Sequence, residues 1–250
     1  RLETVSDLQT NVAATLTVPN DVMSARIQPV RVESQRLGDG VWLIRGGSHH
    51  SVAVEFGDYV AVIEAPLNEE RSLAVIGEVN RLIPSKPIRF IVTTHHHWDH
   101  LGGLRAYIHE GATVITQEGN KPYYKEILRA GPWTLEPDRF SLYPPEEWSE
   151  GYIFETLNQK YVLADDTQRV ELYTVQGLAH AAGMLIAYIP SEKIVVQADL
   201  YTPGAATPNA SARTFNRTLQ RMDLDVETIV GIHGSPVPMS QFAEFVGAGQ

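Results

Sequence analysis

Short apolar runs separated by polar residues recur along the chain from Val41 onward. Residues 41–44, 51–56 and 59–65 are rich in branched and aromatic side chains, and the Gly-Asp pair at 57–58 has the composition of a hairpin turn. These runs predict three strands, of which the last two form an antiparallel hairpin.

A helical pattern follows at residues 68–84. Apolar residues from Leu73 to Ile83 recur at the spacing of one helix face, Asn68 is a suitable N-cap, and Pro84 ends the pattern. The same reasoning predicts further strands at 88–94, 112–116, 160–164, 169–175, 184–189, 193–199 and 227–232. It predicts further helices at 101–110, 118–130 and 210–222, and a last one that begins near 240.

The order of these elements indicates the fold class. Two separate stretches of consecutive strands with interleaved helices predict a layered α/β domain in which two sheets pack face to face. A chain of 250 residues suits one large domain. Residues 1–35 are polar and lack a clear period, so we interpret them as an N-terminal appendage to a main domain at 36–250.

Composition narrows the possible partners and metal ligands. A net charge of −10 offers no basic face to a phosphate backbone, and no apolar run approaches the length of a membrane span, so we expect a small-molecule substrate, no nucleic acid and no membrane. Because the chain has no cysteine, any metal must be held by histidine and carboxylate side chains. The chain begins at Arg1 and not at a methionine, which fits an N-terminally shortened protein or one processed during export, and we lean towards export.

The stretch TTHHHWDHLGG at 93–103 holds four of the nine histidines. At the end of a strand, His95 and His97 project to one side while His96 points away. Where the chain turns into the following helix, Asp99 and His100 can face a second point. Neutral imidazoles are good ligands for zinc and iron, so the segment can serve two ions.

Three more candidate ligands stand at the ends of other predicted strands, namely His180, Asp199 and His233. Strand ends on one rim of a sheet are where ligand-binding loops collect. We assign one ion to His95, His97 and His180 and the other to Asp99, His100 and His233, with Asp199 as a bridge. This arrangement leaves room for a water or hydroxide between two divalent ions.

The pattern His95-x-His97-x-Asp99-His100, followed by His180, Asp199 and His233, resembles the metallo-β-lactamase superfamily over roughly residues 36–250. The resemblance implies a four-layer αββα sandwich with a dinuclear site, usually of zinc, although iron or manganese also suits such ligands. Asp199 stands where many true β-lactamases of that family carry Cys or Ser, and is more like the glyoxalase II, lactonase and phosphodiesterase branches.

The leading functional hypothesis is a dinuclear metal-dependent hydrolase. In it, a hydroxide that bridges the metals attacks a small ester, lactone, thioester or amide, and Asp99 orients this nucleophile as a catalytic residue. The alternatives are β-lactamase-type amide hydrolysis and a mononuclear iron redox enzyme of the persulfide dioxygenase type. The intact ligand set argues against a fold that has lost its chemistry.

Several residues near the motif allow both a functional and a purely structural interpretation. His49 and His50 lie either in a loop near the pocket mouth or in a plain surface turn. Trp98 either walls the pocket or packs under a helix, and Tyr201 is either a donor to the substrate or a core residue. The loop from Trp133 to Trp148 is either a lid or a surface loop.

Overall fold

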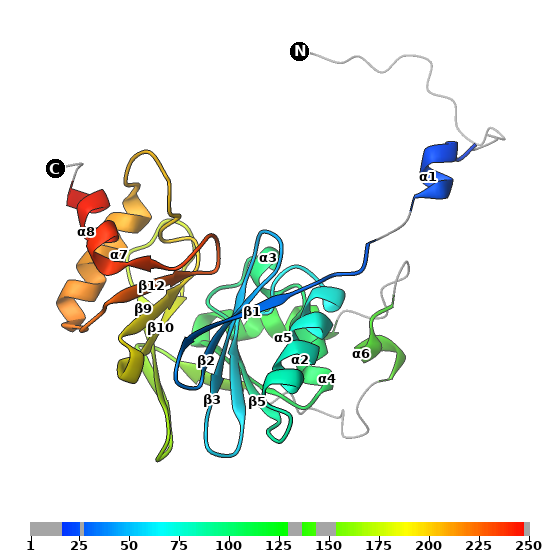
Figure 1. The fold of residues 1–250 in the computed structure, drawn as a ribbon, viewed down its shortest axis with the longest axis horizontal. Helices are drawn as coiled ribbons and strands as arrows, with labels where there is room; N and C mark the ends of the chain where they lie inside the picture. The colour runs from blue at the N-terminus through cyan, green and yellow to red at the C-terminus, as the bar shows by residue number, and fades with distance from the viewer. Residues whose placement is uncertain (1–16, 26–27, 130–136, 144–153, 248–250) are drawn as a thin grey trace, which may run out of the picture.

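A computed structural model of the chain describes residues 17–25, 28–129, 137–143 and 154–247. Two sheets lie face to face and helices cover their outer faces, so the order of layers is helix, sheet, sheet, helix (Figure 1). The predicted four-layer αββα sandwich is therefore confirmed.

The first sheet has seven strands in the order of the sequence. Its first four strands pair antiparallel and the rest pair parallel. The strands are β1 (Glu33–Gly38), β2 (Val41–Arg45), β3 (Ser51–Glu55), β4 (Val60–Ile63), β5 (Ile88–Val92), β6 (Thr113–Gln117) and β7 (Phe154–Leu157).

The second sheet has six strands in the order β13-β12-β11-β10-β9-β8. All neighbours pair antiparallel except β11 and β12, which are parallel. The strands are β8 (Lys160–Ala164), β9 (Arg169–Val175), β10 (Met184–Ile189), β11 (Ile194–Gln197), β12 (Thr228–Gly231) and β13 (Val237–Pro238).

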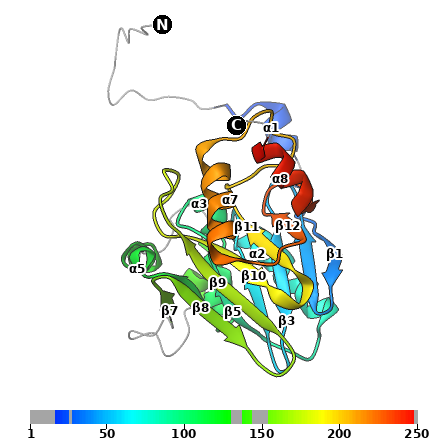
Figure 2. The ribbon, with the colours of Figure 1, turned by 90° about the vertical axis from the view of Figure 1, so that its left-hand side faces the viewer.

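Helices form the two outer layers. On the first sheet lie α2 (Glu69–Leu82), α4 (Leu104–His109) and α5 (Lys121–Arg129), together with the short α3 (Trp98–Leu101) and α6 (Arg139–Leu142). Figure 2 shows α7 (Ala210–Met222) and α8 (Met239–Gly247) in front of the second sheet. The short α1 (Asn20–Ser24) buries none of its residues, and 3₁₀ turns span Glu118–Asn120 and Pro190–Glu192. Among the described residues, no helix has both the length and the apolar character needed to cross a bilayer.

Strand alternation divides the core. In β3, Val52 and Val54 point between the two sheets, whereas Ala53 packs towards α2 and its neighbours. The same division runs through β4, where Ile63 faces the second sheet and Val62 faces the helices. Each sheet is thus buried on both faces in its centre, which is why the strands read as nearly continuous apolar runs.

Most predicted elements are confirmed, including the Asn68 cap, whose side chain accepts a hydrogen bond from the Arg71 N–H. The helix predicted at 101–110 is α4, which begins only at Leu104, because Gly102 and Gly103 separate it from the short α3. A Cβ on Gly102 would lie 2.1 Å from the Leu67 carbonyl oxygen, so the glycines allow close packing on the start of α2. The strands β1, β7 and β13 were not predicted, and β1 begins before the expected domain boundary at residue 36.

Two backbone hydrogen bonds join the sheets at the end where the candidate ligands stand. The Leu185 N–H donates to the Thr94 carbonyl at 2.8 Å, and the His50 N–H donates to the Ile232 carbonyl at 2.9 Å. These bonds hold the loops of the two sheets against each other, so residues far apart in sequence meet there.

Candidate metal centre

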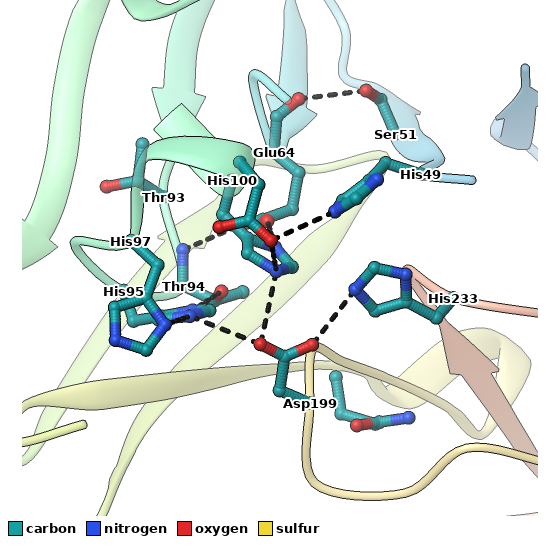
Figure 3. Close-up of polar contacts among 12 residues, drawn as sticks. His49, Ser51, Glu64, Thr93, Thr94, His95, His97, His100, Asp199 and His233 are labelled. Carbon is teal, nitrogen blue, oxygen red and sulfur yellow. Dashed lines mark hydrogen bonds and ion pairs between the residues drawn. The ribbon is translucent and has the colours of Figure 1, made fainter. Parts of the chain in front are cut away.

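The seven predicted ligands gather at one end of the sandwich, and Figure 3 shows five of them, His95, His97, His100, Asp199 and His233. His95 and His97 follow β5, and Asp99 and His100 lie in α3. From the second sheet, His180 comes from the loop between β9 and β10, and Asp199 and His233 follow β11 and β12. Each sheet therefore supplies part of the centre from its strand ends.

The first cluster consists of His95, His97, His180 and Asp199. One potential ligand atom from each of the four lies within 4.8 Å of the others. The His95 Nε2 is 3.0 Å from the His97 Nδ1, and the His180 Nε2 is 3.0 Å from the Asp199 Oδ2. This is the set that was assigned to the first ion, together with the bridging carboxylate.

The second cluster consists of His49, His100 and His233, again with ligand atoms within 4.8 Å of one another. Asp99 lies at its margin, since the Asp99 Oδ2 is 3.4 Å from the His49 Nε2 and 3.7 Å from the His100 Nε2. His100 and His233 are thus brought together as expected, and His49 joins them. The coordination of ions by these residues stays a prediction.

Asp199 connects the two clusters. Its Oδ1 is 3.0 Å from the His233 Nε2, while its Oδ2 faces His95 and His180 of the first cluster and His100 of the second. The backbone of Asp199 has a φ of 57°, a conformation that costs energy for a residue with a Cβ and that often occurs at functional sites. Gln197 holds this turn, because its side-chain oxygen accepts hydrogen bonds from the N–H groups of Leu200 and Tyr201.

The far sides of several imidazoles have partners of their own. The Glu64 Oε2 is 2.6 Å from the His100 Nδ1, the Thr94 Oγ1 is 3.0 Å from the His95 Nδ1, and the Ser48 carbonyl oxygen is 2.9 Å from the His233 Nδ1. These contacts leave the Nε2 atoms of the three rings turned towards the centre. Such outer contacts orient the ring and select the tautomer in metal sites.

Burial and charge oppose each other at this centre. Burial lowers the pKa of His100, but the negative charge of Glu64 and the contact with Asp199 outweigh it and raise the pKa to about 10. Burial would raise the pKa of Asp199, yet hydrogen bonds with His100, His233 and His95 hold it well below its usual range. Burial and neighbouring imidazoles lower the pKa of both His49 and His97.

The side chains fit divalent metal ions. The ring nitrogens of His95 and His97 face each other at 3.0 Å, and the buried His100 Nε2 lies 3.2 Å from the Asp199 Oδ2. Converging imidazole nitrogens that share a carboxylate are the donor set that zinc and iron prefer. The arrangement is therefore suited to bind cations and to present them at a rim where a substrate can approach.

Sequence reasoning missed His49 as a member of the centre, and it missed Glu64. His49 is 7% exposed and Glu64 is fully buried, so neither lies in a plain surface turn. The only signal in the sequence was the polar pair His49–His50 and the isolated Glu64 beside otherwise apolar strands. Both residues lie close to the motif in the fold but far from it in the sequence.

The structure decides some of the open alternatives. Tyr201 is a core residue, because it is 4% exposed and its ring packs on Phe242 and Phe245. Trp98 is 67% exposed and borders a cavity, which excludes packing under a helix. The predicted lid residues Trp133 and Trp148 lie outside the described residues.

The comparisons with known proteins agree with this geometry. The family model described as the metallo-beta-lactamase superfamily matches residues 44–233. No curated protein matches the chain. Among solved structures, a metallo-β-lactamase from Pontibacter korlensis is similar at a TM-score of 0.67 and 19% identity, with 87% of this chain and 98% of that chain covered.

Two further structures show the same fold. The metallo-β-lactamase FIM-1 from Pseudomonas aeruginosa in its mono-zinc form has a TM-score of 0.65 and 17% identity, with 89% of this chain and 96% of that chain covered. A metallo-β-lactamase from Erythrobacter litoralis has a TM-score of 0.64 and 16% identity, with 89% and 97% covered. Given the family match, the fold and the clustered His and Asp side chains, the chain belongs to the metallo-β-lactamase superfamily.

Proposed function

We propose that the protein is a dinuclear metal-dependent hydrolase that acts on a small ester, lactone, thioester or amide. The observation that carries the proposal is the Asp199 carboxylate, which lies within 3.4 Å of ring nitrogens from both imidazole clusters. A carboxylate between two groups of neutral donors is suited to hold two cations side by side.

The proposed ligands are His95, His97 and His180 at the first position and Asp99, His100 and His233 at the second, with Asp199 shared. When bound, zinc supplies a water of lowered pKa and an electrophile for the substrate oxygen. The protein contributes the placement of these donors on strand ends of two packed sheets, which gives little freedom to the donor atoms.

Asp99 is the residue proposed to handle a proton. It lies on the short helix α3, and its side chain is 34% exposed, which leaves it open to water and substrate. Its Oδ2 is 3.4 Å from the His49 Nε2, so one oxygen is oriented by that ring. The carboxylate can accept a hydrogen bond from an attacking water and later pass the proton to the leaving group.

A cavity beside the centre offers room for part of a substrate. It has a volume of about 660 Å³, and Trp98 forms part of its wall together with Leu101, Leu104, Tyr123 and Ile127. None of the clustered His and Asp residues is among the described residues that line it, but Trp98 and Leu101 at the two ends of α3 do line it and flank Asp99 and His100. This supports a small substrate with an apolar portion.

The test combines metal analysis with activity. We expect about two zinc ions per chain and hydrolysis of at least one lactone, thioester or ester in a panel that also includes β-lactams. Treatment with a chelator should abolish turnover, and added zinc should restore it. His180→Ala should lose activity, whereas His109→Ala, on helix α4 and outside both clusters, should keep it.

Other outcomes would contradict this proposal. One iron per chain together with oxygen uptake would support a redox enzyme instead. Hydrolysis confined to β-lactams would support the β-lactamase alternative. A chain that binds no metal under these conditions would exclude all three metal-dependent functions.

For the proton-handling role, Asp99→Asn should lower kcat by about 100-fold or more, because general acid–base groups commonly contribute this much. The zinc content of the same sample separates lost chemistry from a lost ion. Glu110→Gln is the matched control, since Glu110 is an exposed carboxylate just after α4. Unchanged turnover in Asp99→Asn would remove Asp99 from the reaction.

A further inference from the structure

His49 is the member of the centre that the ligand pattern of the sequence does not include. It comes from the loop between β2 and β3, far from the His95–His100 segment in the chain. His49 is buried, with 7% of its surface exposed, and its ring contacts the rings of His100 and His233. The ring nitrogens of a buried imidazole need a hydrogen-bond partner or a metal ion.

The backbone of this loop is held from three directions. The Ser48 carbonyl oxygen lies 2.9 Å from the His233 Nδ1, and the His50 N–H donates to the Ile232 carbonyl at 2.9 Å. The Arg71 guanidinium, itself 2% exposed, donates to the His49 carbonyl oxygen at 3.0 Å and to that of Ile44 at 3.2 Å. The position of His49 is therefore built by both sheets and by helix α2.

The ring of His49 is oriented like the rings of metal ligands. Its Nδ1 is 2.8 Å from the Ser48 Oγ, which leaves the Nε2 directed to the centre. The ring centroid is 4.2 Å from that of His233 and 5.1 Å from that of His100, and nitrogens of the three rings lie within 4.8 Å of one another. Figure 3 shows the rings of His49 and His233 on the same side of the site, opposite His95 and His97.

The other contact of this ring does not account for its position. The Nε2 of His49 lies 3.4 Å from the Asp99 Oδ2, which is long for a hydrogen bond to a carboxylate. Asp99 is partly exposed and can be solvated by water, so it does not need a buried imidazole. The convergence on His100 and His233, in contrast, makes a three-nitrogen site of the kind that binds zinc.

We propose that His49 is a metal ligand, so that three imidazoles, His49, His100 and His233, hold the second ion. This inference rests on the proposed function only in requiring a cation at the second position. It gives the second position nearly the same donors as the first, since both have three imidazoles and share Asp199. The Asp99 carboxylate lies beside this group, with its Oδ2 at 3.4 Å from the His49 Nε2.

The experiment measures zinc affinity directly and does not depend on turnover. Wild type, His49→Ala and His49→Gln are stripped with a chelator and titrated with zinc against a chromophoric competitor, and the bound zinc is counted after dialysis. The matched control is His50→Gln, since His50 is an equally buried imidazole in the same loop that lies outside both clusters.

We expect two zinc ions in wild type and His50→Gln, and one firmly bound zinc in both His49 variants. The second dissociation constant should rise by more than about 100-fold, because loss of an outer contact alone costs 10- to 100-fold. With cobalt in place of zinc, the visible absorption of the second ion should change in His49→Gln. Thermal melting of the metal-free proteins shows whether each variant folds. His49→Gln largely preserves the side-chain volume, so it serves as the test if His49→Ala does not fold.

Two results separate the proposals. If wild type binds two zinc ions and both His49 variants bind them with unchanged affinity and cobalt absorption, the assignment of His49 is wrong and the proposed function stands. If wild type binds no zinc at all, both the proposed function and the assignment of His49 are wrong.

Discussion

At the scale of single residues, Glu64 shows how a buried carboxylate can prepare an imidazole for a metal. One of its oxygens accepts a hydrogen bond from the Thr94 N–H at 2.7 Å, and the other lies 2.6 Å from the His100 Nδ1. A carboxylate accepts but does not donate, so in the neutral form of His100 the proton is held on Nδ1 and the Nε2 lone pair faces the centre. The φ of 76° at Glu64 aims the side chain inward from the end of β4.

Glu64→Gln tests this positioning role. The amide can still accept from Thr94, but it then directs an NH₂ group at the His100 Nδ1, so we expect zinc affinity to fall by about 10- to 100-fold. Affinity is measured by competition with a chelator, and melting of the metal-free variant reports the purely structural cost. A variant that melts earlier without metal but binds zinc as tightly as wild type would show that Glu64 only supports the core.

At the scale of elements, the hairpin of β8 and β9 forms the outer edge of the second sheet and carries a charged cluster. The Glu171 carboxylate on β9 accepts hydrogen bonds from Lys160 at 2.8 Å, from Arg169 at 2.7 Å and from the Tyr173 hydroxyl. Charged side chains at an edge strand also discourage pairing with another chain. Burial raises the pKa of Glu171, but these bonds outweigh it and lower the pKa to about 2.

This shift predicts a pH dependence of stability. Because the pKa of Glu171 is lower in the folded than in the unfolded chain, its contribution is present above about pH 4.5 and is lost as the pH falls towards about 2. Glu171→Gln should therefore cost roughly 2 kcal/mol at pH 7, and this difference should shrink below pH 4.5. Urea unfolding of metal-free protein from pH 7 to pH 3 measures it. Glu155→Gln, an exposed acid on β7, is the control, and a difference independent of pH would contradict the assignment.

At the scale of the whole molecule, the two sheets share one centre. The segment after β5 gives His95, His97 and His100, and the second sheet gives His180, Asp199 and His233. Ions held by both sets would link the sheets at the end where only two backbone hydrogen bonds between them are described, those of Leu185 and His50. Metal binding should then stabilise the fold as a whole and not only one loop.

Chelation tests this link. At a free zinc concentration 100 times the dissociation constant, binding to the folded state alone contributes about 2.7 kcal/mol. Removing zinc should thus lower the Tm by roughly 5 to 10 °C for a chain of this size. Calorimetry with and without a chelator measures the shift, and Asp199→Asn, which lacks the shared carboxylate charge, should show a much smaller one. Equal Tm values for wild type in both conditions would contradict the proposed role of the ions.

The sequence by itself determined the features that depend on local spacing. Alternation along a strand placed His95 and His97 on one side, and apolar periodicity located most strands and the helices α2 and α7. Because strand ends of packed sheets share a rim, the grouping of His180, Asp199 and His233 with the motif could also be predicted.

Only the tertiary structure decided what depends on packing between distant segments. His49 joins the centre because its loop is bonded to Ile232 at the end of the second sheet, and Glu64 reaches His100 because β4 and β5 pair side by side. The strand β7 forms through parallel pairing with β6, which is distant in the sequence. Its four residues are too few to show a strand pattern of their own. Local periodicity indicates which face of a helix or strand is buried, whereas the tertiary structure determines which other element packs on that face.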